Sequence, residues 1–185
     1  MFDLTIEMAE AILAIEPGHK DRMISLGVSP DIADPTDGRH QWGIAKVRPE
    51  GDYHFIPDPE DGKEAFISFA CQGSNVVDLI AWHPAAPSKW RWRIGETPVL
   101  NVDAINRRWP NEGPLQVHRN PLDHLRAGAE GLVVLDWAAN SDIRRLALVD
   151  AIAGPADVIN RIDRILRTPV RMPRLLRSEP PRAAA

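Results

Sequence analysis

The segment between residues 40 and 94 constrains the fold most, because five short apolar runs follow one another with only a few residues between them. Connections this short join neighbouring antiparallel strands, whereas parallel neighbours need a crossover of about a dozen residues or more. We therefore expect an antiparallel β-meander. The predicted strands are 40–47, 52–57, 64–71, 75–82 and 89–94.

The last of these runs, KWRWRI, alternates strictly between apolar and charged residues. With a period of two, Trp90 and Trp92 share one face of the strand, and Arg91 and Arg93 share the other. Two interpretations stay open. Either the tryptophans pack in the core while the arginines face water, or the rings stack with unpaired bases while the arginines neutralise phosphates. Six tryptophans and one tyrosine favour core packing, because tyrosine is frequent on recognition surfaces.

Helical patterns precede and follow these strands. Residues 3–16 have apolar side chains at helical spacing, with Asp3 as the cap and Pro17 and Gly18 as the stop signal. The expected fold class is α+β, in which helices pack an antiparallel sheet, with a possible βαβ unit in the C-terminal half. That unit comprises strand 116–118, helix 121–130 and strand 132–137, and further helices are predicted at 141–153 and 155–166.

The length of the chain limits the number of domains. A chain of 185 residues, 44% of them hydrophobic, can form one core of moderate size. We expect a single domain over residues 1–168 and a basic, proline-rich tail over residues 169–185. Four prolines prevent regular helix in this tail.

Charge is divided unequally along the chain. Residues 1–85 contain 6 basic and 15 acidic residues, which gives −9, whereas residues 86–185 contain 16 and 11, which gives +5. Such a division indicates a basic surface for phosphates, or two surfaces that attract each other within the fold or between copies. The candidate binding residues are Arg91, Arg93, Arg161, Arg164, Arg167, Arg171, Arg174 and Arg177.

Two sets of residues are candidates for catalysis. Cys71 precedes a turn whose amides could hold an oxyanion, with His83 or His118 as the base, although a lone cysteine that ends an apolar strand is more often a buried small hydrophobe. Asp136 follows a predicted buried strand and could act with His118 and His124. No metal site is expected, because Asp123 and His124 are adjacent on a helix and point about 100° apart. No cofactor is expected either, since both Gly-rich phosphate-binding motifs are missing.

The N-terminal sequence and the single cysteine bear on the compartment. Acidic residues stand where a secretory signal carries Lys or Arg, and no apolar run approaches the roughly 18 residues of a membrane span. One cysteine allows no internal disulfide framework. We expect a cytoplasmic protein without a membrane partner.

The segment AFISFACQGSNVVDLIAWHPAAPSKWRWRIGE, followed by PLQVHRNPLDHLRAGAEGLVVLDW, resembles uncharacterised small proteins of bacterial prophage-like and mobile elements. The similar region covers about two fifths of the chain, from residue 65 to residue 137. The resemblance implies an accessory role near the replication, packaging or regulation of foreign DNA. It carries no catalytic residue.

The leading hypothesis is a non-enzymatic binding or accessory protein, in which a basic C-terminal helix and tail bind nucleic acid or an acidic protein surface. One alternative is a small hydrolase-type enzyme that uses Cys71 with a nearby histidine. Another alternative is a structural protein that associates with copies of itself.

Overall fold

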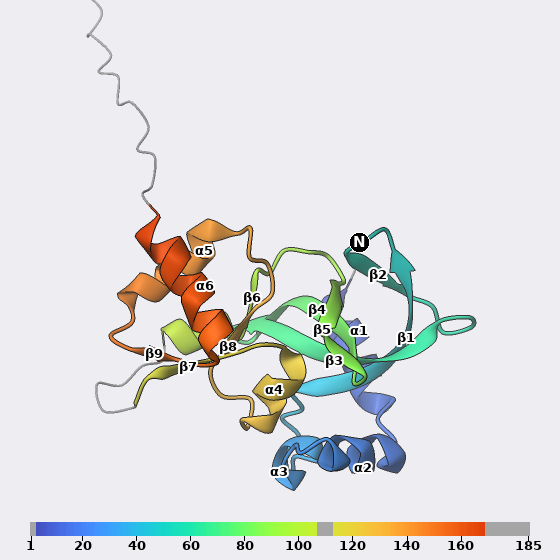
Figure 1. The fold of residues 1–185 in the computed structure, drawn as a ribbon. Coiled ribbons are helices and arrows are strands. Elements are labelled where there is room, and N and C mark those ends of the chain that lie inside the picture. The colour runs from blue at the N-terminus through green and yellow to red at the C-terminus, as the bar shows by residue number, and fades with distance from the viewer. Residues whose placement is uncertain (1–2, 107–112, 169–185) are drawn as a thin grey trace, which may run out of the picture.

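The computed structural model describes residues 3–106 and 113–168 and contains helices together with two β-sheets (Figure 1). The α+β class expected from the sequence is therefore confirmed. The predicted tail, with Arg171, Arg174 and Arg177, lies outside the described residues.

The first sheet is a closed barrel with the strand order β1-β2-β5-β4-β3. Its strands are β1 (Trp42–Glu50), β2 (His54–Pro57), β3 (Lys63–Gln72), β4 (Asn75–His83) and β5 (Ala86–Trp92). Consecutive strands pair antiparallel within the hairpins β1-β2, β3-β4 and β4-β5, as expected. The simple meander is wrong, however, because the first part of β1 pairs with β3 while its last part pairs with β2. One parallel pair, His54 with Trp92, then closes the barrel.

The apolar interior of the barrel is covered by helix α1 (Leu4–Leu13). The carboxylate of Asp3 caps this helix by accepting the backbone N–H groups of Thr5 and Ile6. Ala11 packs with Phe55, Ile67, Phe69 and Leu79 in one buried cluster. The helix approaches β1 so closely that a Cβ atom at Gly43 would lie 2.7 Å from the Ala11 backbone, so only glycine fits there.

A buried ion pair joins α1 to the end of β5. Arg93 donates two hydrogen bonds to Glu7, from Nε to Oε2 at 2.7 Å and from Nη2 to Oε1 at 3.0 Å. Only 5% of the Arg93 side chain and 18% of the Glu7 side chain are exposed. Such a bidentate pair adds directional hydrogen bonds to the packing of α1, and it is costly to break from one side.

Replacing Glu7 by Gln is expected to lower the free energy of unfolding by about 2 kcal/mol, because the buried guanidinium keeps one acceptor and loses its negative partner. Chemical denaturation measures this difference. Glu10→Gln, an exposed carboxylate on the same helix, is the matched control and should stay within about 0.5 kcal/mol of the wild type. Equal stability of the two variants would contradict a stabilising role for the pair.

The outer face of the barrel carries a row of aromatic rings. The ring centroid of Phe66 lies 5.7 Å from that of Trp42 and 5.3 Å from that of Trp82. Each indole N–H has a partner, since Trp42 donates to the carbonyl of Ile32 and Trp82 donates to the hydroxyl of Ser68. Helices α2 (Pro17–Ser25), α3 (Pro30–Ala33) and α4 (Pro121–Arg126) contribute the residues that cover this row. Pro17, predicted as a stop signal, instead lies at the first position of α2, since α1 already ends at Leu13.

The second sheet packs against the barrel and has the strand order β6-β8-β7-β9. Its strands are β6 (Val99–Leu100), β7 (Leu115–His118), β8 (Leu132–Val134) and β9 (Ile152–Ala153), with a 3₁₀ helix, Val102–Ile105, after β6. Strands β7 and β8 are parallel and α4 connects them, so the predicted βαβ unit is present. The predicted helix 141–153 is wrong in its second half. It divides into α5 (Asn140–Arg144), a 3₁₀ helix (Arg145–Leu148) and β9.

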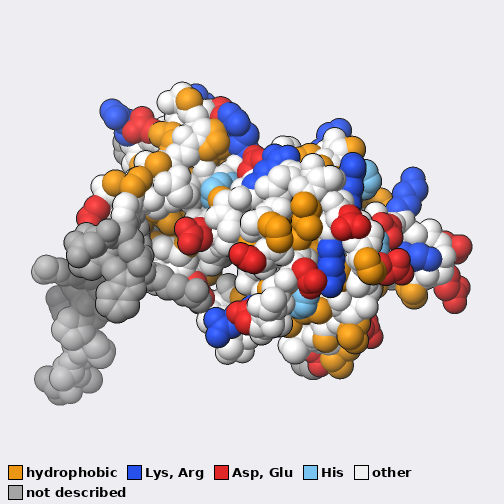
Figure 2. Space-filling model, turned by 90° about the horizontal axis from the view of Figure 1, so that it is seen from below, with side chains coloured by type: hydrophobic (Ala, Val, Ile, Leu, Met, Phe, Trp, Pro, Cys, Tyr) orange, Lys and Arg blue, Asp and Glu red, His pale blue; other side chains and the backbone are white. Residues whose placement is uncertain are grey.

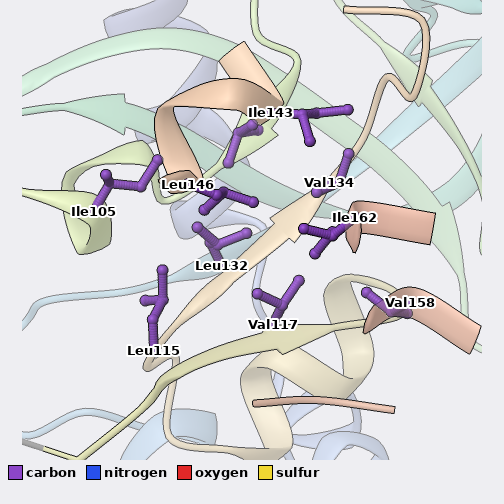
Figure 3. Close-up of a cluster of buried hydrophobic side chains, with 10 residues drawn as sticks. Ile105, Leu115, Val117, Leu132, Val134, Ile143, Leu146, Val158 and Ile162 are labelled. Carbon is purple, nitrogen blue, oxygen red and sulfur yellow. The ribbon is translucent and has the colours of Figure 1, made fainter. Parts of the chain in front are cut away.

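Helix α6 (Ala156–Arg167) covers one side of this second sheet. Figure 3 shows Val158 and Ile162 of α6 directed toward Val117, Leu132 and Val134 of the sheet. The arginines of α6 are exposed, as an amphipathic helix requires. Over residues 3–106 and 113–168, no helix combines the length and apolarity that crossing a bilayer demands.

Candidate functional site

An open cleft of about 640 Å³ lies beside β5, where the barrel is closed most weakly. One edge of β5 pairs with β4 along the strand, but the other edge joins β2 only at Trp92. The backbone N–H of Trp92 donates to the carbonyl of Tyr53 at 2.9 Å. The cleft therefore lies along this second edge of β5, which pairs with β2 at Trp92 but not at residues 86–91. Its polar and aromatic lining includes Tyr53, Trp90, Trp92, Lys63, Lys89, Arg91, Asp52 and Glu64.

The two tryptophans of β5 are both anchored in the core and available to the cleft. Trp90 packs against both apolar clusters on the outer face of the barrel, and Trp92 packs where the barrel meets the second sheet. The Trp92 indole donates to the carbonyl of Thr97 at 3.0 Å. Each ring stays half-buried. Each ring therefore contributes to core packing and also lines the cleft, whereas stacking with bases stays a prediction.

The two arginines of the alternating segment differ in their surroundings. Arg91 lines the cleft, is half-buried, and donates from Nη1 to the carbonyl of Gly51 at 2.9 Å. Arg93 is buried in its ion pair with Glu7 and cannot reach a ligand in solution. The predicted binding role of Arg93 is therefore corrected to a role in packing α1 on the barrel.

The predicted binding residues of α6 are exposed, and two of them contact another side chain. The guanidinium of Arg161 lies 4.3 Å from the centroid of the Trp137 ring, and Arg167 donates to Asp163 at 2.7 Å. Among the described residues, Arg164 forms no ion pair. Helix α6 lies on the side of the second sheet that faces away from the barrel, so its arginines form a surface separate from the cleft (Figure 1).

The structure does not assemble Cys71 with a histidine. Cys71 pairs with Val76 near the start of β4, whereas His83 ends that strand, seven residues or roughly 23 Å farther along. Within the described residues, no hydrogen bond joins Cys71 to any histidine. Burial, with a smaller contribution from Asp103, raises the pKa of the Cys71 thiol. A raised pKa opposes formation of the thiolate that a nucleophile needs.

The two histidines of the βαβ unit lie together and share one acceptor. The carbonyl of Glu130 is 2.9 Å from Nε2 of His118 and 3.1 Å from Nδ1 of His124, so each ring donates there. Burial first, and the neighbouring His118 second, lower the pKa of His124 to about 4. This pair holds the loop before β8 against α4.

Asp136 lies apart from these histidines. Its Oδ1 accepts the backbone N–H of Ala138 at 2.8 Å, and among the described residues it has no hydrogen bond to His118 or His124. Over residues 3–106 and 113–168, no group of three His, Cys, Asp or Glu side chains could hold a metal ion. The predicted acid–base set is therefore not brought together.

Sequence analysis did not identify Asp78, which organises the loop after β5. This carboxylate is fully buried and accepts five backbone N–H groups, those of Leu79 and of residues 93–96, at 2.8 to 3.1 Å. The available signal was a single acidic residue within the apolar run NVVDLIAW. The loop held by Asp78 lies between Trp92, which lines the cleft, and Thr97, whose carbonyl accepts the Trp92 indole N–H.

The charge on the surface is mixed in sign. On the face shown in Figure 2, Lys and Arg side chains alternate with Asp and Glu rather than gathering by sign. Any recognition of a charged partner on this face would have to use individual side chains rather than a broad field.

Comparisons with protein-family models, with curated proteins and with solved structures each return no match to this chain.

Proposed function

We propose that the protein is a non-enzymatic binding protein whose cleft beside β5 takes single-stranded nucleic acid. One observation carries this proposal: aromatic rings and cations line the same concave surface. Stacking of an unpaired base on an aromatic ring stabilises a complex by about 1–3 kcal/mol, and cations neutralise the phosphates that follow. The groups concerned are Tyr53, Trp90 and Trp92 for stacking, and Lys63, Lys89 and Arg91 for phosphates.

Single strands suit this cleft better than duplexes, because a base must leave its pair before its face can meet a ring. The indoles of Trp90 and Trp92 are held from one side by the core, so they lose little conformational freedom when a base stacks on the other side. Recognition of this kind tolerates many sequences, since every base has an aromatic face.

The electrostatic contribution of the cleft is modest. Three cations and two carboxylates, Asp52 and Glu64, line it, which leaves a local charge of about +1. With three phosphate contacts, the logarithm of the binding constant should fall with the logarithm of salt concentration with a slope of about −2. The exposed arginines of α6 would add non-specific phosphate contacts on a separate surface. The mobile-element setting and self-association stay predictions.

Replacing Lys89 by Glu is expected to weaken binding of a fluorescent oligothymidine about tenfold at 100 mM salt, because it removes one phosphate contact and adds a repulsive charge. Lys89 is exposed, so its replacement should not disturb the fold. Fluorescence anisotropy measures the affinity, and quenching of tryptophan emission reports stacking.

The matched control is Lys46→Glu, which changes the same charge at an exposed lysine of β1 outside the cleft and should change the affinity less than twofold. A duplex of equal length should bind more weakly than the single strand. A chain that ends at Thr168 should keep the quenching. If Lys89→Glu binds like the wild type while the shortened chain no longer binds, the C-terminal arginines and not the cleft are the nucleic-acid site.

A further inference from the structure

A second pocket, of about 570 Å³, lies where the barrel meets the loops that follow β5 and β8. Its walls come from three separate parts of the chain: the start of β2, residues 92–98 at the end of β5 and in the loop after it, and the segment 136–142. It shares the rings of Tyr53 and Trp92 with the cleft described above, but those rings separate two surfaces of different charge.

Aromatic rings form one wall of this second pocket. Tyr53 and Trp92 meet edge to face, with centroids 6.5 Å apart and planes inclined by 62°. The hydrogen bond from the Trp92 indole to Thr97 holds one of these rings in place. The negative face of an aromatic ring attracts a cation within about 6 Å.

Carboxylates line the same pocket. Glu96, Asp136 and Asp142 all line the pocket, and the lining includes no lysine or arginine. Within the described residues, none of the three is in an ion pair. Asp136 accepts one backbone N–H, and Asp142 lies 3.3 Å from the hydroxyl of Ser141, so most of their acceptor capacity is unused.

The spacing of these acids excludes one class of ligand. In the described part of the chain, no three such side chains converge closely enough for a metal ion. A larger cation with a delocalised charge satisfies the arrangement better, because its planar face can stack on a ring while its N–H groups, which point outward in the plane, reach carboxylates of the lining. The chain itself contains such stacking, since Arg161 lies over the Trp137 ring.

The geometry points to this pocket as a binding site for an organic cation of the guanidinium class, such as the arginine side chain of a partner peptide. The rings bind the planar face of the guanidinium, and Glu96, Asp136 and Asp142 accept its N–H groups. This inference goes beyond nucleic-acid binding, because it assigns a ligand of opposite charge to a neighbouring surface.

Titration with N-acetylarginine amide and with a short arginine-containing peptide tests the inference. Calorimetry is expected to show saturable binding of both, and total tryptophan emission should change with the same midpoint, because Trp92 lines the pocket. Spermidine, a free polyamine without a guanidinium, should bind at least fivefold more weakly. Tighter binding of spermidine than of both arginine ligands would overturn the guanidinium assignment.

The double variant Glu96→Gln/Asp142→Asn should weaken arginine binding at least tenfold, because two negative charges leave the pocket while the rings stay. Glu60→Gln, an exposed carboxylate outside the pocket, should leave it unchanged. The double variant should not weaken oligothymidine binding, and Lys89→Glu should not weaken arginine binding, so each site can fail alone. No saturable arginine binding by the wild type, or equal binding by the double variant, would overturn the inference.

Discussion

Replacing Asp78 by Asn is expected to lower the free energy of unfolding by about 4 kcal/mol or more. Five backbone N–H groups point at this buried carboxylate, and hydrogen bonds to a charged acceptor contribute about 1.5–3 kcal/mol each before non-additivity is considered. Asparagine has the same shape but only one carbonyl oxygen, so its NH₂ group would face N–H groups such as those of Gly95 and Glu96.

Urea denaturation measures this change, and near-UV circular dichroism reports the environment of Trp92, which the loop held by Asp78 positions. Asp61→Asn, at an exposed site, is the control and should stay within about 0.5 kcal/mol of the wild type. A loss below about 1 kcal/mol in Asp78→Asn would mean that the amides find other partners.

The second large effect is a loss of folding stability at low pH. Stability is expected to fall by about 3 kcal/mol between pH 6.5 and pH 4 through His124 alone, because its pKa is about 4 in the folded protein and near 6.5 in the unfolded chain. Between these values the unfolded chain binds a proton that the folded protein does not. Acid therefore favours unfolding in this window, and the contribution of His124 levels off within about one pH unit above and below it.

The variant His124→Asn isolates this contribution, because an asparagine amide can still donate to the carbonyl of Glu130 but does not titrate. Denaturation at pH 7 and at pH 4.5 should show a stability difference about 2–3 kcal/mol smaller in the variant than in the wild type. His83→Asn replaces an exposed histidine and should leave the difference unchanged. The same pH dependence in all three proteins would show that His124 is not the group responsible.

Local patterns predicted most of the strands, because alternation and turn residues act over a few positions. Each strand from β1 to β5 overlaps its predicted range. The βαβ unit also followed from local signals, since Asn120 caps α4 by accepting the N–H of Asp123. Closure of the barrel was not predictable in this way, because alternation sets which face a residue occupies and not which strand lies at each edge.

The other predictions that were wrong or missing have the same cause, because each depends on a contact between residues far apart in the sequence. The region 141–153 shows apolar residues at helical spacing, but its last part pairs with β7 as β9, a contact between distant segments. No sequence pattern near Arg93 predicts that it pairs with Glu7, and none near Asp78 predicts that it accepts the backbone amides of residues 93–96. Of the residues that line the candidate site, Arg91 was predicted to bind, and Trp90 and Trp92 were expected to pack in the core, with base stacking as the alternative. Tyr53, Lys63 and Lys89 joined them only through the fold.

The ion pair between Glu7 and Arg93 also has a consequence for synthesis on the ribosome. The two residues are separated by 86 positions, so α1 leaves the ribosome before the end of β5 does, and the ion pair cannot form until β5 has emerged. Chains fold during translation from the N-terminus, and exposed apolar surface invites association in that interval. The apolar side of α1 therefore stays exposed in the nascent chain until its partners have emerged, and a chaperone that shields it in that interval would limit association.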